Sequence, residues 1–453
     1  AINNLEKFIQ SLKSREIFYD LLKENTSLLE LLLVLFGNSG YLSDILIRQP
    51  DLLDSLLDVE NIYRFKPKDK MNSELERYLE GIDKIENIKE VLRKFKKGEE
   101  LRIGLRFLLK EADLDSTFAD LSLLAEVYLI HSLRIARIRL TSDFGKPFIK
   151  NLDGKSHECG FAIIGMGKFG GCELDFGSDL DIVFVYEGEG QTEGEVCKGI
   201  QNQEFFTKQV TMIYDLAGSV TSAGYAYIID TDLRPEGKQG VLTLPLSSYK
   251  KYFEERARVW ERQSLTRALF IAGSEDIGER FIELAHEIAY KKRFEYGGPA
   301  EMNRMRMKME KELGKETRNK KDVKVGSGGL VDIEFIAQLL QLKSGGEFPT
   351  LRQTKTAGVL REASRIGLLS IDYYNILKES YDFLRRVING IRIVSERSES
   401  KLPETNGKLS KLAFRMGHTS EDEKKNREGF LDDYARHTRQ VREIYKTFFI
   451  IKK

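Results

Sequence analysis

The sequence has few of the residues that build disulfide frameworks, membrane spans and irregular loops. It contains three cysteines, eight prolines and one tryptophan in 453 residues. Because Cys159, Cys172 and Cys197 are too few for a disulfide framework and lack metal-site spacing, we expect ordinary reduced thiols. The longest apolar run, LLLVLF at residues 31–36, is far shorter than the roughly 20 residues of a membrane-spanning helix. No charged and then apolar leader opens the sequence, so it predicts a soluble, cytoplasmic protein with no membrane partner.

An excess of charge of one sign is also missing. Lys and Arg together number 72, Asp and Glu number 71, and the formal net charge is +1. Nothing global therefore draws the chain toward nucleic acid, which basic surfaces bind, and we expect no nucleic-acid partner. At 453 residues and 41% hydrophobic content, the chain is long enough for two or three folded domains.

Proline is absent between Pro67 and Pro147, where apolar residues recur at the three-to-four spacing of α-helices. The opening of the chain has the same period. It is interrupted by ENTS at residues 24–27 and GNSG at residues 37–40, which we interpret as helix junctions. We therefore predict a mostly helical N-terminal region over residues 1–130.

The pattern changes near Cys159. Short β-branched or aromatic runs bounded by glycine predict strands at FAIIG (161–165), DIVFVY (181–186) and GYAYIID (224–230). Between them, residues 203–220 have helical spacing. The order strand, helix, strand indicates an α/β or α+β core, and we predict the α+β class.

Helical spacing returns after Pro245. It runs through residues 247–273, then 331–342 and 371–396, and a last helix is expected near residues 430–449. The polar stretch SERSESKLPETNGK (395–408) predicts a loop. These patterns predict a C-terminal helical bundle over residues 301–453.

The segment GMGKFGGCELDFGSDLDIVFVY (165–186) carries two like charges into an apolar strand. On a strand, Asp179 and Asp181 project from one face, while Leu180 and Ile182 point into the core. Two adjacent carboxylates repel unless they are neutralised, and Mg²⁺, which prefers carboxylate, water and phosphate oxygens, would do this. The plainer alternative is a glycine turn followed by two solvent-facing aspartates.

Upstream of the aspartates, Gly170 and Gly171 permit a tight turn and the close approach of a ligand to backbone N–H groups. Lys168 and Ser178 are spaced to contact phosphate. A glycine pair, seven residues and then Asp-apolar-Asp-apolar resembles the polymerase-beta-like nucleotidyltransferases. That resemblance implies a polymerase-beta-like core over residues 131–300, two-metal phosphoryl chemistry, and a third carboxylate on a neighbouring strand.

The segment GYAYIIDTDLRPEG (224–237) offers two candidates for that carboxylate. Asp230 and Asp232 also stand two apart, and either one would complete a metal site. Arg234, which follows them, would bind phosphate, cap the strand or pair with Asp232.

The wider sequence resembles the glutamine synthetase adenylyltransferase family, bifunctional enzymes that attach AMP to a tyrosine of glutamine synthetase and remove it. The matching stretches are residues 38–58, GMGKFGGCELDFGSDLDIVF (165–184), DTDLRPEGKQG (230–240), VWERQSLTRA (259–268) and GSGGLVDIEFIAQLLQL (326–342). Together they extend over nearly the whole chain.

The resemblance implies a site for Mg²⁺ and for ATP as substrate. This sequence departs from the family pattern at Asp232, where family members often have arginine. The departure leaves open whether Asp230 or Asp232 is the third metal ligand. By matched position, the implied metal ligands are Asp179, Asp181 and Asp230, the implied nucleotide-phosphate contacts are Gly170, Gly171 and Ser178, and Lys168, Arg234 and Glu334 also fall within matched motifs.

Two further motifs each allow a structural and a functional interpretation. Trp260 and Glu261 match the family's aromatic-acid pair, but Leu269 replaces an arginine that often follows, so we favour core packing for Trp260. GSGGLVDIEF places glycines before a helix, which makes either an anion site at the helix N-terminus or a plain glycine-rich start with a solvated acid. Asp332 and Glu334 are two apart and cannot share a helical face.

Full-length family members carry two such modules, and this chain resembles the C-terminal, adenylylating one more closely. The resemblance then implies transfer of AMP from ATP to glutamine synthetase, with a PII-type nitrogen signal protein as a second partner. The alternative is the adenylyl-removing module, in which phosphate attacks adenylyl-tyrosine and releases ADP. Both directions would use the same carboxylates.

Overall fold

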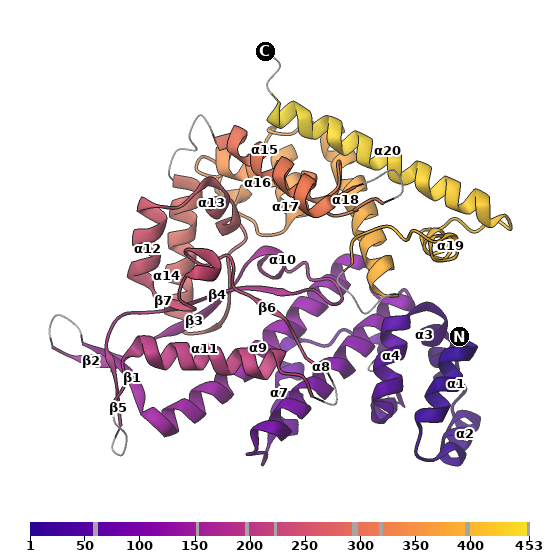
Figure 1. Ribbon diagram of the computed structural model, residues 1–453, viewed down its shortest axis with the longest axis horizontal. Coiled ribbons are helices and arrows are strands. Elements are labelled where there is room, and N and C mark those ends of the chain that lie inside the picture. The colour runs from indigo at the N-terminus through magenta and orange to yellow at the C-terminus, as the bar shows by residue number, and fades with distance from the viewer. Residues whose placement is uncertain are drawn as a thin grey trace. The chain divides into compact units, whose positions relative to one another are not determined.

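The computed structural model describes residues 1–57, 62–150, 154–194, 199–221, 224–291, 298–316, 320–394 and 399–450 (Figure 1). These residues form two compact units. Unit 1 comprises residues 1–250 and 269–281, and unit 2 comprises residues 251–268 and 282–453. The chain therefore passes from unit 1 to unit 2 twice. The module boundaries near residues 130 and 300 stay a prediction, and Cys197 lies outside the described residues.

The first part of unit 1 is helical, as predicted. Both predicted junctions contain helix N-caps: the Asn25 side chain accepts the N–H of Leu28, and the Ser39 hydroxyl accepts the N–H of Leu42. Such caps satisfy N–H groups that the start of a helix leaves unpaired. The helices are α1 (Ile2–Ser11), α2 (Arg15–Glu24), α3 (Thr26–Asn38), α4 (Gly40–Arg48), η1 (Pro50–Leu53), α5 (Asp54–Leu57), α7 (Lys68–Leu79), α8 (Ile85–Leu108) and α9 (Leu114–Phe144).

Helix α8 buries charged side chains in pairs. Lys96 Nζ lies 2.7 Å from Glu100 Oε1, and both side chains are almost fully buried. Burial lowers the pKa of Lys96 to about 8. Burial alone would raise the pKa of Glu100, but the ammonium groups of Lys96 and Lys97 bring it down to about 2. The Tyr41 hydroxyl also donates to Glu100 at 2.7 Å, so one buried carboxylate joins α4 to α8.

The centre of unit 1 is a five-stranded sheet with the order β6-β4-β3-β8, in which β7 also pairs with β4. Its middle strands β3 and β4 are almost wholly buried, which explains their continuous apolar sequences. Helix α11 (Asn202–Gly218) covers one face, since Phe206 stacks on Phe161 of β3 and on Tyr186 of β4 (Figure 1). The strands are β3 (Phe161–Gly165), β4 (Leu180–Tyr186), β6 (Ile229–Asp230), β7 (Thr243–Pro245) and β8 (Leu269–Gly273).

Strand β4 is antiparallel to β3 but parallel to both β6 and β7, so the sheet is mixed. A separate three-stranded antiparallel sheet has the order β2-β1-β5. Its strands are β1 (Lys146–Lys150), β2 (Ser156–Glu158) and β5 (Gln191–Glu193). With its many helices, the chain has the helix-rich α+β architecture expected from the sequence. The polymerase-beta-like identity of the core stays a prediction.

Two predicted elements were wrong in detail. Residues 269–273 belong to β8 and do not continue a helix, because this short apolar run pairs with β3 and a run of that length fits either structure. The predicted strand at residues 224–230 is reduced to Ile229–Asp230. Helix α12 (Leu246–Glu255) and α13 (Val259–Leu265) make up the rest of the predicted helical stretch, and α14 (Glu275–His286) follows β8.

Apart from an isolated bridge between Asp322 and Lys401, the regular elements among the described residues of unit 2 are helices, as expected for the predicted C-terminal bundle. The predicted loop at residues 395–408 is described only from residue 399, and its last residues begin α19. Besides α13, the unit contains η3 (Glu287–Lys291), α15 (Gly298–Met309), η4 (Glu310–Gly314), α16 (Leu330–Ser344), η5 (Pro349–Leu351), α17 (Thr356–Arg365), α18 (Ile371–Arg392), α19 (Asn406–Arg415) and α20 (Glu423–Phe449).

Among the helices that the structure describes, none combines the length and the apolar character needed to cross a membrane.

Candidate active site

Two of the predicted carboxylates become neighbours where β4 and β6 run side by side. In this parallel pair, Asp181 of β4 is the register partner of Asp230 of β6. Neighbouring strands are about 4.8 Å apart, and register partners project to the same face. Asp179 lies two residues before Asp181, just ahead of the strand, while Leu180 and Ile182 are fully buried on the other face. The predicted core positions of Leu180 and Ile182 are therefore confirmed, and a shared face for Asp179 and Asp181 stays a prediction.

Asp232, the other candidate for the third carboxylate, lies beyond the end of β6. Its side chain pairs with Lys238 at 3.3 Å and is 42% exposed. Its backbone N–H donates to Asp230 Oδ1 at 2.7 Å. The strand register thus favours Asp230 as the neighbour of Asp181, and Asp232 helps to orient the Asp230 carboxylate.

These aspartates are neighbours by register and do not form a closed cluster. Within the described ranges, no three His, Cys, Asp or Glu side chains already lie close enough together to hold a metal ion. The oxygen-only donor set nevertheless matches the preference of Mg²⁺, which binds through one or two carboxylates and keeps several waters.

The glycine turn is the short helix α10 (Gly167–Gly170), which connects β3 to the segment before β4. Gly167 has a φ of +52°, and a Cβ there would collide with Oδ2 of Asp181. The N–H groups of Gly170 and Gly171 donate to the carbonyls of Met166 and Gly167, at 2.8 and 3.2 Å. The backbone that lies beside the Asp181 carboxylate is therefore that of Gly167. The sequence analysis did not single out this residue, although the G-x-G pattern of residues 165–167 was a signal.

Lys168 and Ser178 meet at a residue that the sequence analysis also passed over, Asp175. The Lys168 ammonium forms an ion pair with the Asp175 carboxylate, and that carboxylate is completely buried. The Asp175 N–H donates to Ser178 Oγ at 3.1 Å. The structure therefore connects the predicted phosphate-binding side chains to each other through one buried acid.

Arg234 supports the loop that follows β6 and does not pair with Asp232. The side chain is buried, Nη1 donates to the carbonyl and hydroxyl of Thr231, and Nε donates to the carbonyl of Gly240 at 3.1 Å. The guanidinium therefore spans residues 231–240 and closes that loop. A direct contact with nucleotide stays a prediction.

An open pocket of about 530 Å³ adjoins Asp230. It is lined by side chains from α11, from the β6 strand and from the loop after it, including Tyr214, Ile228 and Leu242. The Tyr214 hydroxyl lies 2.8 Å from Thr231 Oγ1. Burial raises the pKa of Tyr214, and the nearby charges of Asp230 and Asp232 add to this effect. The phenol thus stays protonated and is available for hydrogen bonding at the edge of the site.

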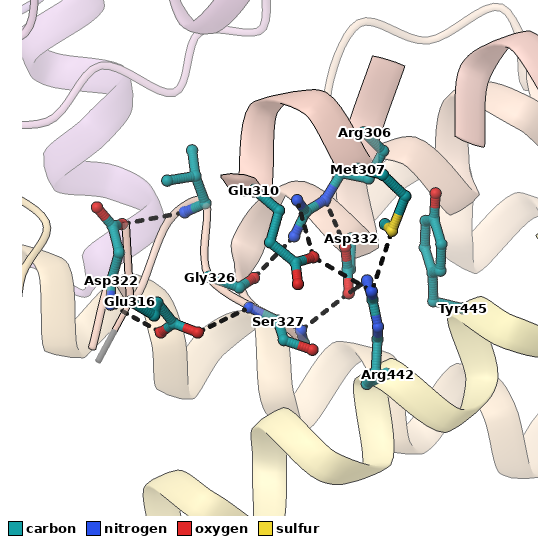
Figure 2. A network of polar contacts seen from close by, with 12 residues as sticks. Arg306, Met307, Glu310, Glu316, Asp322, Gly326, Ser327, Asp332, Arg442 and Tyr445 are labelled. Carbon is teal, nitrogen blue, oxygen red and sulfur yellow. Dashed lines mark hydrogen bonds and ion pairs between the residues drawn. The ribbon is translucent and has the colours of Figure 1, made fainter. Parts of the chain in front are cut away.

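In unit 2, Asp332 lies at the centre of a buried ion network (Figure 2). Arg306 Nε of α15 donates to its Oδ1 at 2.5 Å, and Arg442 Nη1 of α20 donates to its Oδ2 at 3.0 Å. Glu310 lies 3.3 Å from Arg306 and 3.2 Å from Arg442. The acid thereby joins three helices, α15, α16 and α20, and is not solvated.

The glycines before Asp332 serve the same packing. Gly328 has a φ of +71°, a Cβ there would collide with the Thr438 carbonyl of α20, and its N–H donates to Asp332 Oδ2 at 2.9 Å. The N–H groups of Leu330 and Val331 donate to backbone carbonyls at 3.0 Å. The predicted anion site at this helix N-terminus is therefore wrong, because its donors already have partners within the chain.

The remaining motif residues meet within unit 2. Glu334 lies 3.6 Å from Arg267 of the WERQSLTRA motif. Glu261 accepts the N–H of Arg258 at 2.9 Å and the Tyr252 hydroxyl at 2.6 Å, which fixes the start of α13. Trp260 is half-buried. These contacts give Glu261 a structural role, and the core packing expected of Trp260 stays a prediction.

Two protein-family models match different parts of the chain. Residues 29–284 match the model of the glutamate-ammonia ligase adenylyltransferase family. Residues 301–449 match the model named GlnD PII-uridylyltransferase.

Curated relatives match over most of the chain, and each is named bifunctional glutamine synthetase adenylyltransferase/adenylyl-removing enzyme. The one from Thioalkalivibrio sulfidiphilus is 31% identical over 420 residues, which is 93% of this chain and 42% of the relative. The one from Psychromonas ingrahamii is 33% identical over 87% of this chain and 43% of the relative. The one from Pseudomonas aeruginosa is 32% identical over 86% of this chain and 41% of the relative. The chain thus spans less than half the length of these relatives.

Proposed function

The chain belongs to the glutamate-ammonia ligase adenylyltransferase family, and from that premise we propose that it transfers AMP from ATP to a tyrosine of glutamine synthetase. The tyrosine hydroxyl attacks the α-phosphate of ATP, a new O–P bond forms, and pyrophosphate leaves. The observation that supports this best is the register of Asp181 beside Asp230, with Asp179 two residues away.

In this proposal Asp179, Asp181 and Asp230 hold Mg²⁺. A bound Mg²⁺ would favour ionisation of the attacking hydroxyl and stabilise the charge that develops on the phosphates. The buried side chains of Leu180 and Ile182 anchor β4, so that its carboxylates keep their positions. Because Gly167 has no side chain, the Asp181 carboxylate can lie directly against its backbone.

The other predicted residues surround this centre. Lys168 binds the phosphates through its ammonium, and Ser178 contributes a hydroxyl. The amides of Gly170 and Gly171 are used within α10, so these glycines shape the turn in our proposal and do not coordinate phosphate. Arg234 holds the loop after Asp230 closed through its hydrogen bond to Thr231. In our proposal this is a supporting role and not a nucleotide contact.

The adenylyl-removing direction is the second candidate, because the relatives' printed name couples both activities. In that direction inorganic phosphate attacks adenylyl-tyrosine, and ADP leaves with the tyrosine hydroxyl restored. We favour adenylylation because the opening segment and the VDIEF and WERQSLTRA motifs resemble the second module. The similarity of residues 301–449 to a PII-uridylyltransferase model supports a PII-type signal protein as a second partner.

One experiment separates the two directions. Unmodified glutamine synthetase is incubated with the chain, Mg²⁺ and ATP labelled at the α-phosphate, and label on the synthetase is measured. We expect label that is lost with a chelator and restored by Mg²⁺. An unlabelled synthetase, together with phosphate-dependent release of ADP from adenylylated synthetase, would instead establish the removing direction.

A further inference from the structure

The segment between α10 and β4 is fixed at several points by unit 1. The N–H of Leu174 donates to Ser122 Oγ of α9 at 3.2 Å. Phe176 is 1% exposed and packs against the ring of Tyr41, with 6.2 Å between ring centroids. At its end, the Ser178 N–H donates to the Asp175 carbonyl at 3.2 Å. The backbone that bears Asp175 is therefore held on both sides.

The side chain of Asp175 reaches back from this segment to α10. Its carboxylate is 0% exposed and pairs with the ammonium of Lys168, which is 12% exposed. A buried carboxylate needs a partner, and an isolated one is strongly unfavourable. The turn contacts of Asp175 to Ser178 use backbone N–H and C=O, so the side chain is not needed for them.

A lysine side chain has about 2 kcal/mol of rotamer entropy, which a contact must overcome to fix it. Pairing with an immobile carboxylate holds the ammonium of Lys168 in one place, and an ammonium has three N–H donors in all. Lys168 sits on the helix whose first glycine touches Asp181. The ion pair thus determines where a positive charge stands beside the proposed metal site.

We propose that Asp175 is a positioning residue, which fixes the Lys168 ammonium so that it meets the phosphates of the nucleotide. This rests on the proposed function for the identity of that nucleotide. In this proposal Asp175 acts through its ion pair with Lys168 and is not itself a ligand of ATP or metal.

The test is a double-mutant cycle on the complete chain, with Asp175→Asn, Lys168→Met and the double variant. AMP transfer is measured against ATP concentration. A charge-assisted contact to phosphate is worth about tenfold or more in affinity, so each single variant should raise KM for ATP by about that factor. Because both act on one contact, the double variant should match Lys168→Met, and kcat should change less than threefold in all of them, an estimate consistent with loss of binding alone.

The proposal fails if the two effects multiply in the double variant, or if Asp175→Asn lowers kcat while KM stays unchanged. Asp175→Glu keeps the charge and shifts it by one methylene, so it should fold and give an intermediate KM. If Asp175→Asn behaves as the wild type does while Lys168→Met is impaired, positioning by Asp175 is disproved.

The matched control is Asp120→Asn. Asp120 is also a buried acid paired with a cation, Arg106, in the same unit. It should lower thermal stability and leave KM for ATP unchanged, and an equal rise in KM would mean that general loosening explains both variants.

If the wild type transfers no AMP, calorimetric titration of ATP into the same proteins still measures the coupling, so failure of the proposed reaction is distinguishable from failure of the positioning role.

Discussion

Both units of the chain contain glycines followed by two acids that are separated by one residue. The acids have different surroundings in the two units. In unit 1 the acids are Asp179 and Asp181, and in unit 2 they are Asp332 and Glu334. A strand repeats every two residues, so the first pair shares a face. A helix turns about 100° per residue, so the second pair points in different directions. Asp332 is fully buried between two arginines, whereas Asp181 is half-buried beside another acid.

The glycines differ in the same way. Gly167 and Gly328 both have positive φ, and a Cβ on either would collide with a neighbour. The neighbour of Gly167 is the Asp181 carboxylate, so the missing side chain lets that carboxylate lie against the backbone of α10. The neighbour of Gly328 is a backbone carbonyl of α20, so its bareness brings two helices together. A glycine pair before acids is therefore not in itself a sign of a ligand site, since the secondary structure that follows decides its use.

The largest expected effect comes from removing a proposed metal ligand. Asp181→Asn and Asp230→Asn should each lower AMP transfer by about a thousandfold, or roughly 4 kcal/mol in the barrier, because the charge that binds metal is lost. The melting temperature should be unchanged or higher, since repulsion between like charges is relieved. The measurement is label transfer together with thermal unfolding.

Asp232→Asn is the matched control, because this acid stands two residues further along and pairs with Lys238 at the surface. It should retain transfer to within several-fold, as expected for an exposed ion pair worth at most about 1 kcal/mol. If Asp232→Asn loses activity and Asp230→Asn keeps it, then Asp232 and not Asp230 is the third metal ligand.

The acid in unit 2 should behave in the reverse manner. Asp332→Asn leaves Glu310 as the remaining countercharge of Arg306 and Arg442, and breaking a buried ion pair costs about 3 kcal/mol or more of unfolding free energy. Trp260 lies in unit 2 and is the single tryptophan of the chain, so its fluorescence in a urea titration reports this loss. Transfer per folded molecule should stay near the wild-type value. A variant of normal stability without transfer would place Asp332 in the chemistry.

A smaller effect should follow from filling the space beside Asp181. Gly167→Ala puts a methyl group against the carboxylate and should reduce transfer about a hundredfold, near 3 kcal/mol, at saturating Mg²⁺. Gly177→Ala is the control, because Gly177 has a φ of +65° but nothing within 4 Å of an added Cβ. It should show only the left-handed strain of about 1 kcal/mol in stability. Equal losses of activity in both would mean that strain, and not the collision, matters.

The faces and the order of the core elements could be predicted from sequence because they depend on local periodicity. Leu180 and Ile182 alternate with the acids, and β3, β4 and α11 lie where their patterns indicated. Residues 269–273 could not be assigned from sequence, because a five-residue apolar run suits a helix or a strand until its partner, here β3, is known.

The partners of buried charged side chains could not be predicted from the sequence for the same reason. Nothing in the local pattern of Asp175 shows that its carboxylate is buried against Lys168, seven residues earlier. Likewise, the partners of Asp332 are 26 and 110 residues away, so a buried ion network was mistaken for a choice between an anion site and a solvated acid. Sequence periodicity identifies a face, and the fold identifies what covers it.

The smallest expected effect concerns acid sensitivity, which should be greater in unit 2. Burial lowers the pKa of His131 in unit 1, and of His286 and His437 in unit 2, below the ordinary value of 6.5. Below pH 6.5 the unfolded chain binds protons that the folded chain resists, so stability falls as pH falls through that value. The urea concentration at the midpoint of unfolding, followed by Trp260 fluorescence, should therefore fall between about pH 7 and pH 5.5. This interval spans the ordinary histidine pKa of about 6.5. His437→Gln should reduce the drop, and a midpoint independent of pH would show that these histidines titrate alike in both states.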